Sequence, residues 1–282
     1  MRINKLFNYH RILIGLILLV FIVIITLVGP CIHQYFPKET DYSSQFVSPS
    51  FTKHIFGTDN FGRDLFSRCL YGCRLSLYIG VMCTFLIMVI GTIVGIAAAF
   101  STVFDSIIMR FMEVTMAIPA MLLAMIIMSI FGYDANKLII AIAIVFVPQV
   151  ARIVRGEALS NKVEGYVKAS YAQGASIFRI IYYHTLPNMV SVLLVQSTFT
   201  FAYAILTETA LSFLGLGVPA TEISLGLLLA EGREFVFFAP WLSLFPGLAI
   251  MLIVLSFNLL GDGFRDYFDV NLNKDIKRVE DN

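Results

Sequence analysis

A thirty-residue stretch without a charged side chain, residues 75–104, constrains this chain more than any other feature of its sequence. An α-helix rises about 1.5 Å per residue and the hydrocarbon core of a bilayer is roughly 30 Å thick, so about 20 apolar residues suffice to cross it. A water-soluble domain has no need for so long an unbroken apolar run. The stretch therefore predicts a transmembrane helix.

The composition also indicates a protein embedded in lipid. Hydrophobic residues make up 58% of the chain and charged residues only 14%, whereas about 25% of an ordinary soluble protein is charged. The formal net charge is +1, and no basic stripe interleaved with aromatic residues is present. This balance gives no basis for a nucleic-acid partner.

The uncharged intervals predict an all-α, polytopic membrane protein with six transmembrane helices. The fourth interval is the weakest, because it reaches full length only if Lys137 and Arg152 extend their charged ends to the two interfaces. The six predicted spans are residues 12–30, a part of residues 75–104, and residues 114–133, 138–151, 185–207 and 235–261.

Basic residues near the span ends predict the orientation, because Lys and Arg concentrate in cytoplasmic loops. The N-terminal segment carries Arg2, Lys5 and Arg11 without an acid, and residues 151–188 also hold an excess of bases. The segment before the sixth span instead holds three acids and a single base. Six crossings of the cell membrane with both termini in the cytoplasm fit these observations. The loop after the first span is the exception, since bases and acids are mixed there.

The sequence lacks the usual motifs of catalysis and metal binding. The cysteines Cys69 and Cys73 lie four apart without a Cys-x-x-Cys spacing, so packing is favoured over a metal pair. No phosphate-binding Gly-x-x-x-x-Gly-Lys loop, His-Glu-x-x-His pair or Gly-x-Ser-x-Gly elbow occurs. We therefore expect no catalytic residue, no metal site and no cofactor. Uphill transport would take its energy from a partner or from an ion gradient.

The predicted cytoplasmic segment 151–188 has the pattern of a helical hairpin. Gly174 weakens a first helix, Ser176 can cap a second one over residues 177–184, and Pro187 suits the first turn of the next span. Small residues line one face of the first helix. Patterning alone leaves two interpretations open, a docking element for a partner protein and an amphipathic connector lying on the lipid headgroups.

The same segment resembles the EAA loop of ABC importer membrane subunits. The resemblance is carried by Lys168-Ala-Ser-Tyr-Ala-Gln-Gly174 followed by His184-Thr-Leu-Pro187. Further strings resemble the C-type permease subunit of the dipeptide, oligopeptide and nickel branch, and the similarity covers residues 11–269. These strings are Phe56-Gly-Thr-Asp-Asn-Phe-Gly-Arg-Asp64, Arg152-Ile-Val-Arg-Gly-Glu157, Leu211-Ser-Phe-Leu-Gly-Leu-Gly217, Ala239-Pro-Trp-Leu-Ser-Leu-Phe-Pro-Gly247 and Asn258-Leu-Leu-Gly-Asp-Gly-Phe-Arg-Asp266.

The resemblance implies a MetI-like type I importer fold and a transport complex. In that complex the chain would pair with a homologous B-type permease, two ATP-hydrolysing subunits and an extracytoplasmic solute-binding protein. It would be a permease and not an enzyme, with ATP bound by its partners. The implied organisation is an N-terminal helix and outer segment over residues 1–73, a five-helix core over 74–269 and a cytoplasmic tail over 270–282.

The resemblance also assigns candidate coupling residues in the loop 164–187, where a short helix would enter a cleft on the ATPase. The family's acidic first position is Lys168 here, and its second alanine is Ser170. This departure leaves the electrostatics of docking open. The candidate coupling residues are Tyr166, Lys168, Ala169, Ser170, Gly174, Ala175, Leu186 and Pro187.

Two residues within or next to the predicted spans are candidates for the translocation path. Glu208 is an acid near the end of the fifth span, and an acid in a membrane is costly enough to suggest function, although it can also lie at the outer interface. Pro119 can kink the third span and line a cavity. In the outer segment, Asp64 and Arg68 have the i,i+4 spacing of a helix ion pair.

Two functions from other classes compete with an ABC importer subunit. An ion-driven transporter needs titratable residues near the middle of the bilayer, and only Glu208 qualifies. A membrane scaffold would bind partners without ATP-dependent flux. The substrate also remains open, since peptides, nickel and metal chelates are all handled in the branch that the chain resembles.

Overall fold

The computed structural model describes the backbone of residues 2–32 and 35–280, and the side chains of residues 10–29 and 35–268. Helices dominate this described part of the chain, and its only β-pairing is a single bridge between Thr58 and Asp64. The helices are α1 (Arg2–Ile32), α2 (Leu65–Phe100), α3 (Thr102–Phe104), α4 (Arg110–Ala117), α5 (Ala120–Phe131), α6 (Ala135–Lys162), α7 (Gly165–Ala172), α8 (Ile177–Ile180), α9 (Leu186–Phe213), α10 (Leu225–Gly232) and α11 (Trp241–Glu280).

Five helical segments are long and apolar enough to cross a membrane, which confirms the all-α membrane fold. They are His10–Gly29, Leu65–Phe100, Ala135–Lys162, Ile177–Phe213 and Trp241–Phe268. A sixth crossing exists if the bent pair Thr102–Ala117 and Ala120–Phe131 forms one span. The long helices extend beyond the uncharged intervals that predicted them; for example, α2 begins at Leu65 and α6 continues to Lys162.

The third predicted span, residues 114–133, is broken at Pro119, the residue that the sequence suggested as a kink. The chain bends by 96° between α4 and α5. Ile118 is extended, with ψ 130°, and Pro119 is the N-cap residue of α5. The residue before a proline is sterically driven out of the helical region, so the helix ends before Pro119 instead of continuing through it. Pro148, in contrast, lies inside α6.

The centre of the molecule is built by α2, α6 and α9. Gly91 and Gly95 let α2 approach α6 closely, since a Cβ at Gly91 would lie 2.7 Å from Val150 and one at Gly95 would lie 2.6 Å from the Ala151 carbonyl oxygen. Small residues spaced four apart commonly allow membrane helices to pack closely against each other. This glycine pair therefore packs α2 against α6 within the subunit.

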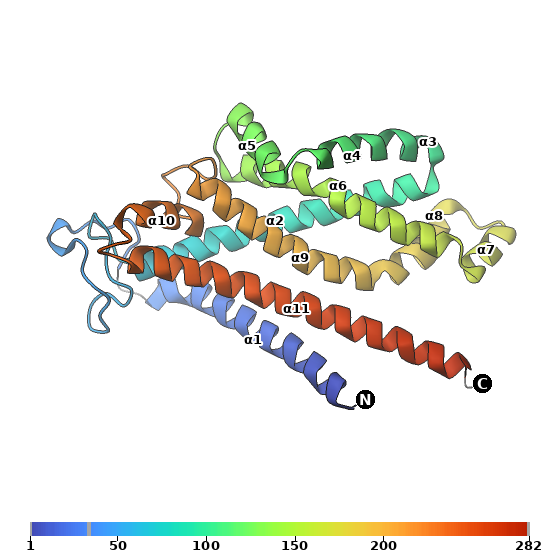
Figure 1. The fold of residues 1–282 in the computed structure, drawn as a ribbon, viewed down its shortest axis with the longest axis horizontal. Helices are drawn as coiled ribbons and strands as arrows, with labels where there is room; N and C mark the ends of the chain where they lie inside the picture. Colours follow the sequence, from blue (N-terminus) through green and yellow to red (C-terminus); the bar gives the residue numbers. More distant parts are fainter. Residues whose placement is uncertain (1, 33–34, 281–282) are drawn as a thin grey trace.

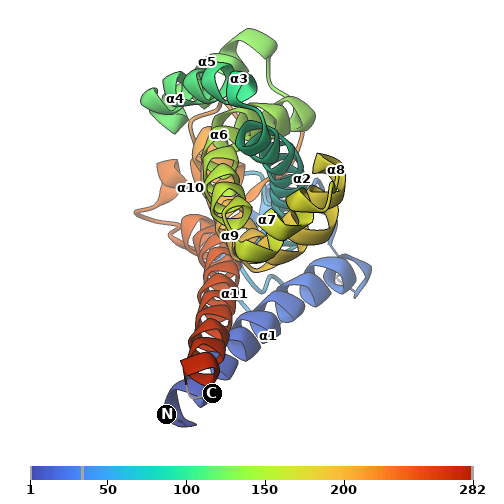
Figure 2. The ribbon, with the colours of Figure 1, turned by 90° about the vertical axis from the view of Figure 1, so that its right-hand side faces the viewer.

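The ends of the molecule differ (Figure 1). At one end α7 and α8 form a hairpin. The N-terminal end of α1 and the C-terminal end of α11 point in the same direction as this hairpin. At the other end lie residues 35–64, here called the N-terminal loop, and the short helix α10. Figure 2 shows α1 and α11 side by side on one flank, with α4 and α5 on the opposite flank.

Candidate functional site

The hairpin at residues 161–188 has a fixed backbone turn. Gly174 has φ +82°, a left-handed conformation that L side chains rarely adopt. The Gly174 amide donates to the Tyr171 carbonyl at 2.9 Å, and the Ala175 amide donates to the Ser170 carbonyl at 3.1 Å. Glycine in this conformation is the common end of a helix. Ser176 then caps α8 by accepting from the Arg179 amide at 3.4 Å. The predicted helix–glycine–helix turn is confirmed.

The second arm of the hairpin is not a separate helix over residues 177–184. A π-helical turn, Ile181–Thr185, joins α8 to α9, so one helix runs from Ile177 to Phe213. Pro187 follows the π-helical turn, in the first residues of α9, and therefore lies inside this continuous helix instead of at the helix start that the sequence predicted. α8 is therefore continuous with the long membrane helix.

A polar triangle ties the hairpin to two membrane helices. The Tyr166 hydroxyl of α7 donates to Asn161 Oδ1 of α6 at 3.2 Å, and Asn188 Nδ2 of α9 donates to the Tyr166 oxygen at 2.5 Å. Asn188 Nδ2 also lies 3.3 Å from Asn161 Oδ1. Partial burial and the nearby Glu164 carboxylate raise the pKa of the Tyr166 phenol, so it stays a hydrogen-bond donor at neutral pH. Sequence reasoning named Tyr166 but missed both asparagines.

The inner face of α7 is fastened to the rest of the hairpin. Val167 is fully buried, and the Ser170 hydroxyl lies 3.2 Å from His184 Nε2 across the turn. Ser170 also donates to the Tyr166 carbonyl at 2.9 Å. The replacement of alanine by serine at position 170 therefore provides a hydrogen bond across the hairpin.

The outer face of the hairpin is open. Lys168 and Ala169 are exposed, as is Gly174, around which a Cβ would meet nothing within 4 Å. Phe178 is 85% exposed. Of the eight candidate coupling residues, Tyr166, Lys168, Ala169, Ser170, Gly174 and Ala175 lie together on α7 and its turn, whereas Leu186 and Pro187 lie in the first turn of α9, with Leu186 half-buried.

An ion pair between Asp105 and Arg155 lies on the same side of the membrane helices as the hairpin. Both carboxylate oxygens of Asp105 accept from the Arg155 guanidinium, one of them from Nη2 at 2.6 Å. Nearby, Lys162 Nζ donates to the Ala99 carbonyl at 3.3 Å. These contacts tie the segment after α2 to α6. Their partners are far apart in the sequence, so no local spacing predicted them.

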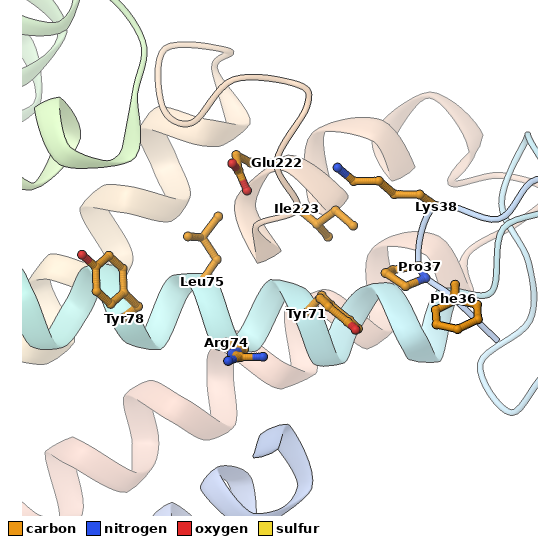
Figure 3. Close-up of a pocket in the computed structure, with 9 residues that line it drawn as sticks. All are labelled: Phe36, Pro37, Lys38, Tyr71, Arg74, Leu75, Tyr78, Glu222 and Ile223. Carbon is orange, nitrogen blue, oxygen red and sulfur yellow. The ribbon is translucent and has the colours of Figure 1, made fainter. Parts of the chain in front are cut away.

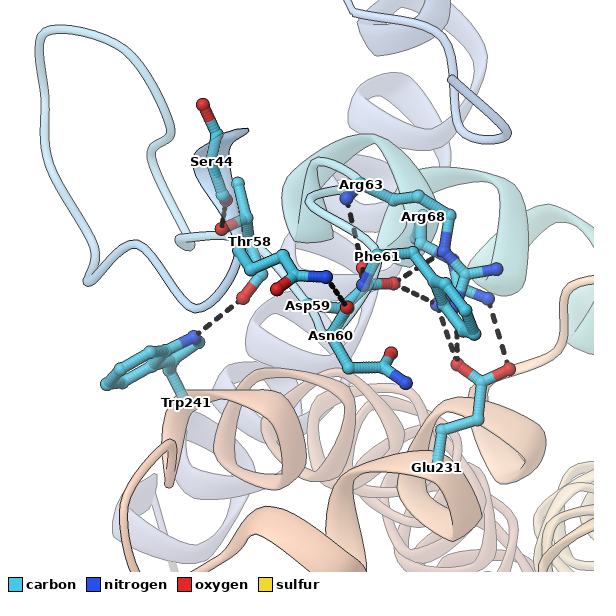
Figure 4. A network of polar contacts seen from close by, with 10 residues as sticks. Ser44, Thr58, Asp59, Asn60, Phe61, Arg63, Arg68, Glu231 and Trp241 are labelled. Carbon is cyan, nitrogen blue, oxygen red and sulfur yellow. Dashed lines mark hydrogen bonds and ion pairs between the residues drawn. The ribbon is translucent and has the colours of Figure 1, made fainter. Parts of the chain in front are cut away.

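At the other end, Arg68 of α2 joins the N-terminal loop to α10 (Figure 4). Its Nη1 lies 2.7 Å from Asp59 Oδ2 and 2.6 Å from Glu231 Oε2. Arg63 adds a second cation, 2.6 Å from Asp59 and 3.4 Å from Glu231. The loop is held further by Trp241 of α11, whose indole N–H donates to the Thr58 carbonyl at 3.2 Å.

The predicted Asp64–Arg68 pair is wrong. Asp64 precedes α2 and caps it by accepting from the Ser67 amide at 2.8 Å, and its other oxygen lies 2.9 Å from His54 Nδ1. The i,i+4 rule applies to residues inside a helix, and a capping residue has its side chain turned back to the helix terminus. Arg68 is therefore left for Asp59 and Glu231.

Glu208 is fully buried between α2, α9 and the start of α10. Its Oε1 accepts from the Ser212 hydroxyl at 2.9 Å and its Oε2 from the Ser76 hydroxyl at 3.1 Å. Ser76 also lies 3.4 Å from the Leu225 amide at the start of α10. Glu208 is thus not at a solvated interface in this structure. The other candidate for the path, Pro119, is exposed at the bend between α4 and α5.

Together, the bundle and its surface hairpin define a multi-pass membrane protein in which a short exposed helix connects two spans. The chain matches the family of binding-protein-dependent transport system inner membrane components over residues 80–274. It belongs to this family and is the permease subunit of an ABC importer, a multi-pass protein of the inner membrane. In this family the ATPase activity lies in separate subunits.

Named relatives and a solved structure agree with this assignment. A protein of Brucella abortus, provisionally named a peptide transport system permease, is 45% identical over 269 residues, covering 95% of this chain and 90% of that protein. The dipeptide transport system permease protein DppC of Alkalihalophilus pseudofirmus is 42% identical over 258 residues, 91% of this chain and 84% of that one. The inward-facing MetNI methionine ABC transporter shares the fold, with a TM-score of 0.59 and 17% identity over 70% of this chain and 94% of that chain. The MetI-like fold is thereby confirmed.

Proposed function

We propose that this permease forms half of a path for short peptides and is driven by ATPase subunits that dock on the α7–α8 hairpin. The hairpin carries the proposal, because its outer face is exposed while its inner face is hydrogen-bonded to two membrane helices. The names of the relatives support peptides over nickel or metal chelates. The expected coupling residues remain the eight named in the sequence analysis.

The proposed complex contains this chain, a homologous B-type permease, two ATPase subunits and an extracytoplasmic solute-binding protein. The hairpin and both termini would face the cytoplasm, and the N-terminal loop and α10 would face the binding protein. The hairpin, the N-terminal end of α1 and the C-terminal end of α11 all point in one direction, which supports this orientation. The division into residues 1–73, 74–269 and 270–282 is kept as part of the proposal.

In the proposed mechanism, ATP binding closes the two ATPase subunits and moves the docked hairpin. Asn161 passes this motion to α6, and Asn188 together with the π-helical turn passes it to α9. The path then opens outward to receive substrate, and hydrolysis resets it. Such a switch requires contacts that differ between the two states, and the hairpin is the element where they would differ.

Pro119 and Glu208 have separate roles in this proposal. Pro119 would face the path at the bend between α4 and α5, and the angle between these two short helices would change during transport. Glu208 would act from behind the path wall, because its carboxylate holds Ser76 of α2 and Ser212 of α9 and no part of it is exposed.

Uptake by the reconstituted complex tests the proposal. Proteoliposomes holding both permeases and both ATPases, with the binding protein added outside, should accumulate radiolabelled alanyl-alanine only when ATP is enclosed. Radioactive nickel should not accumulate. Uptake driven by a proton or sodium gradient without ATP would indicate a secondary transporter. The absence of any flux with all subunits present would indicate a scaffold.

A further inference from the structure

A cavity of about 610 Å³ opens beside the outer part of α2, at the end of the molecule opposite the hairpin. Three segments line it (Figure 3): residues 36–38 after α1, the stretch of α2 from Tyr71 to Tyr78, and residues 222–223 before α10. Sites for small ligands commonly measure about 300–1,000 Å³. The cavity is therefore large enough for a small molecule.

Charged groups of both signs line this cavity without pairing to each other. Neither the Arg74 guanidinium nor the Glu222 carboxylate makes a hydrogen bond or ion pair with any described residue. Figure 3 shows Arg74 on α2, beside Tyr71 and Tyr78, and Glu222 in the separate segment before α10, so the two charges come from different parts of the cavity wall. Lys38 adds a second cation, whose Nζ donates to the Thr221 carbonyl at 2.9 Å. Elsewhere at this end the charges of Arg68, Arg63, Asp59 and Glu231 are paired, so these unpaired ones stand out.

The rest of the cavity wall is apolar or aromatic. Tyr71, Leu75, Tyr78 and Ile223 surround the charges, and the described residues contain no group of three or more His, Cys, Asp or Glu side chains placed to hold a metal ion. Apolar walls with a few well-placed polar groups are typical of a site that orients a small ligand. A ligand complementary to this cavity carries a cationic group for Glu222, an anionic group for Arg74, and a short, partly apolar segment between them.

We propose that this cavity binds a short peptide by its free termini, with Glu222 facing the α-ammonium group and Arg74 facing the α-carboxylate. The inference rests on the proposed function, since it names how the permease first holds the peptide. Guanidinium groups bind carboxylates through paired, charge-assisted hydrogen bonds, so Arg74 suits the C-terminus. The rings of Tyr71 and Tyr78 and the side chain of Leu75 contact the side chains of the bound peptide. Because these contacts are not specific, peptides with different side chains can bind.

Photolabelling tests this binding mode directly. The complete transport complex is illuminated with the dipeptide alanyl-photoleucine during ATP-driven uptake, and the labelled residues are mapped by mass spectrometry. Label should appear on residues 36–38, 71–78 or 222–223, and free alanyl-leucine should compete with it. A blocked peptide, N-acetyl-alanyl-leucine amide, should compete roughly tenfold less well, because a lost charge-assisted hydrogen bond weakens binding by about that factor.

Charge-removing variants provide the second measurement. Glu222→Gln and Arg74→Gln should each reduce labelling of the cavity roughly tenfold. Glu234→Gln removes an exposed acid that follows α10 and lies outside the cavity, so its labelling should match the wild type. Binding of the solute-binding protein to the complex is measured in parallel on the same variants.

Several results would overturn the inference. Label confined to other residues, or unchanged labelling in both cavity variants, would show that the peptide is not held there. Weaker binding of the solute-binding protein with normal labelling would make the cavity a docking surface for that protein instead. Dipeptide uptake by the wild type is recorded in the same vesicles. Its presence with a failed labelling test would reject the cavity alone, and its absence would reject the proposed peptide transport and the cavity together.

Discussion

Tyr166 is the residue through which α6, α7 and α9 meet. Replacing it by phenylalanine keeps the ring and removes the hydroxyl that bonds Asn161 and Asn188. Each lost hydrogen bond costs about 0.5–1.5 kcal/mol, which is small against the stability of the bundle. We predict that Tyr166→Phe assembles normally but lowers the amount of peptide imported per ATP hydrolysed severalfold, with uptake and ATP hydrolysis measured together in proteoliposomes.

The matched control for this prediction is Tyr171→Phe on the same helix. Tyr171 is exposed, and its hydroxyl has no partner among the described residues. Its loss should leave the ratio of peptide imported to ATP hydrolysed unchanged. Equal ratios in Tyr166→Phe and the wild type would show that the polar triangle does not transmit the motion.

Arg68 is a second residue whose neighbours decide its role. Its side chain is only 3% exposed and bridges Asp59 to Glu231. Removing one partner of a buried ion pair costs about 3–5 kcal/mol, because the other charge stays buried; here Arg63 still faces Asp59 and reduces the loss. Arg68→Met should therefore lower the midpoint of thermal unfolding of the purified subunit clearly. Lys53→Met changes an exposed residue of the same loop and should leave this midpoint unchanged. Similar unfolding midpoints for Arg68→Met and Lys53→Met would contradict the prediction.

Among the elements, α10 packs closely against α9 at Gly226. A Cβ at Gly226 would lie 2.6 Å from the Thr209 carbonyl oxygen of α9 and 2.8 Å from Ser212 Cβ. The backbone of α9 cannot move aside as easily as a flexible side chain. An added methyl group at Gly226 should therefore lower the free energy of unfolding by about 1–3 kcal/mol. We predict that Gly226→Ala lowers thermal stability and increases protease cleavage near residues 214–224.

Gly156 provides a control of opposite sign. It lies inside α6 with nothing within 4 Å of an added Cβ. Alanine in a helix interior is favoured over glycine by about 0.5–1 kcal/mol. Gly156→Ala should therefore keep or raise the unfolding temperature. A loss of stability as large as that of Gly226→Ala would mean that the close approach of α10 is not the cause.

The hairpin and the existence of the spans could be predicted from the sequence because their signals are local. Gly174 sets the turn and Ser176 sets the cap by their own chemistry. Pro187 did not mark a helix start, because the helix runs from Ile177 through it. The bend of the third span was harder to predict, since proline is tolerated within lipid-buried helices, as Pro148 shows, and apolar composition does not distinguish a kink from a break.

The polar contacts of the site were predictable only in part, because most join residues far apart in the chain. Arg68 and Glu231 are 163 positions apart, and Asn161 and Asn188 are 27 apart. Local spacing suggested Asp64 for Arg68, although that side chain caps its own helix. Resemblance to a family identified Tyr166, whereas its asparagine partners required the folded arrangement of α6 and α9.

For the whole molecule, we predict that the N-terminal loop lies outside the cell and that the α7–α8 hairpin lies in the cytoplasm. Phe51 of the N-terminal loop is 99% exposed and Val163, beside the hairpin, is 62% exposed. In a Cys31→Ser background, Phe51→Cys should react with a membrane-impermeant thiol reagent added outside intact cells. Val163→Cys should react only after the cells are opened. Cys69, Cys73 and Cys83 are buried and should contribute little background. The reverse labelling pattern would invert the topology.

The most direct measurement is a cross-link from the hairpin to the ATPase. Ala169 is exposed on α7, and an Ala169→Cys variant carrying a short photoreactive group tests what it touches in the assembled complex. The account predicts a cross-link to an ATPase subunit whose yield changes when ATP is bound. Cross-links to lipid or to the solute-binding protein, with none to an ATPase subunit, would contradict it.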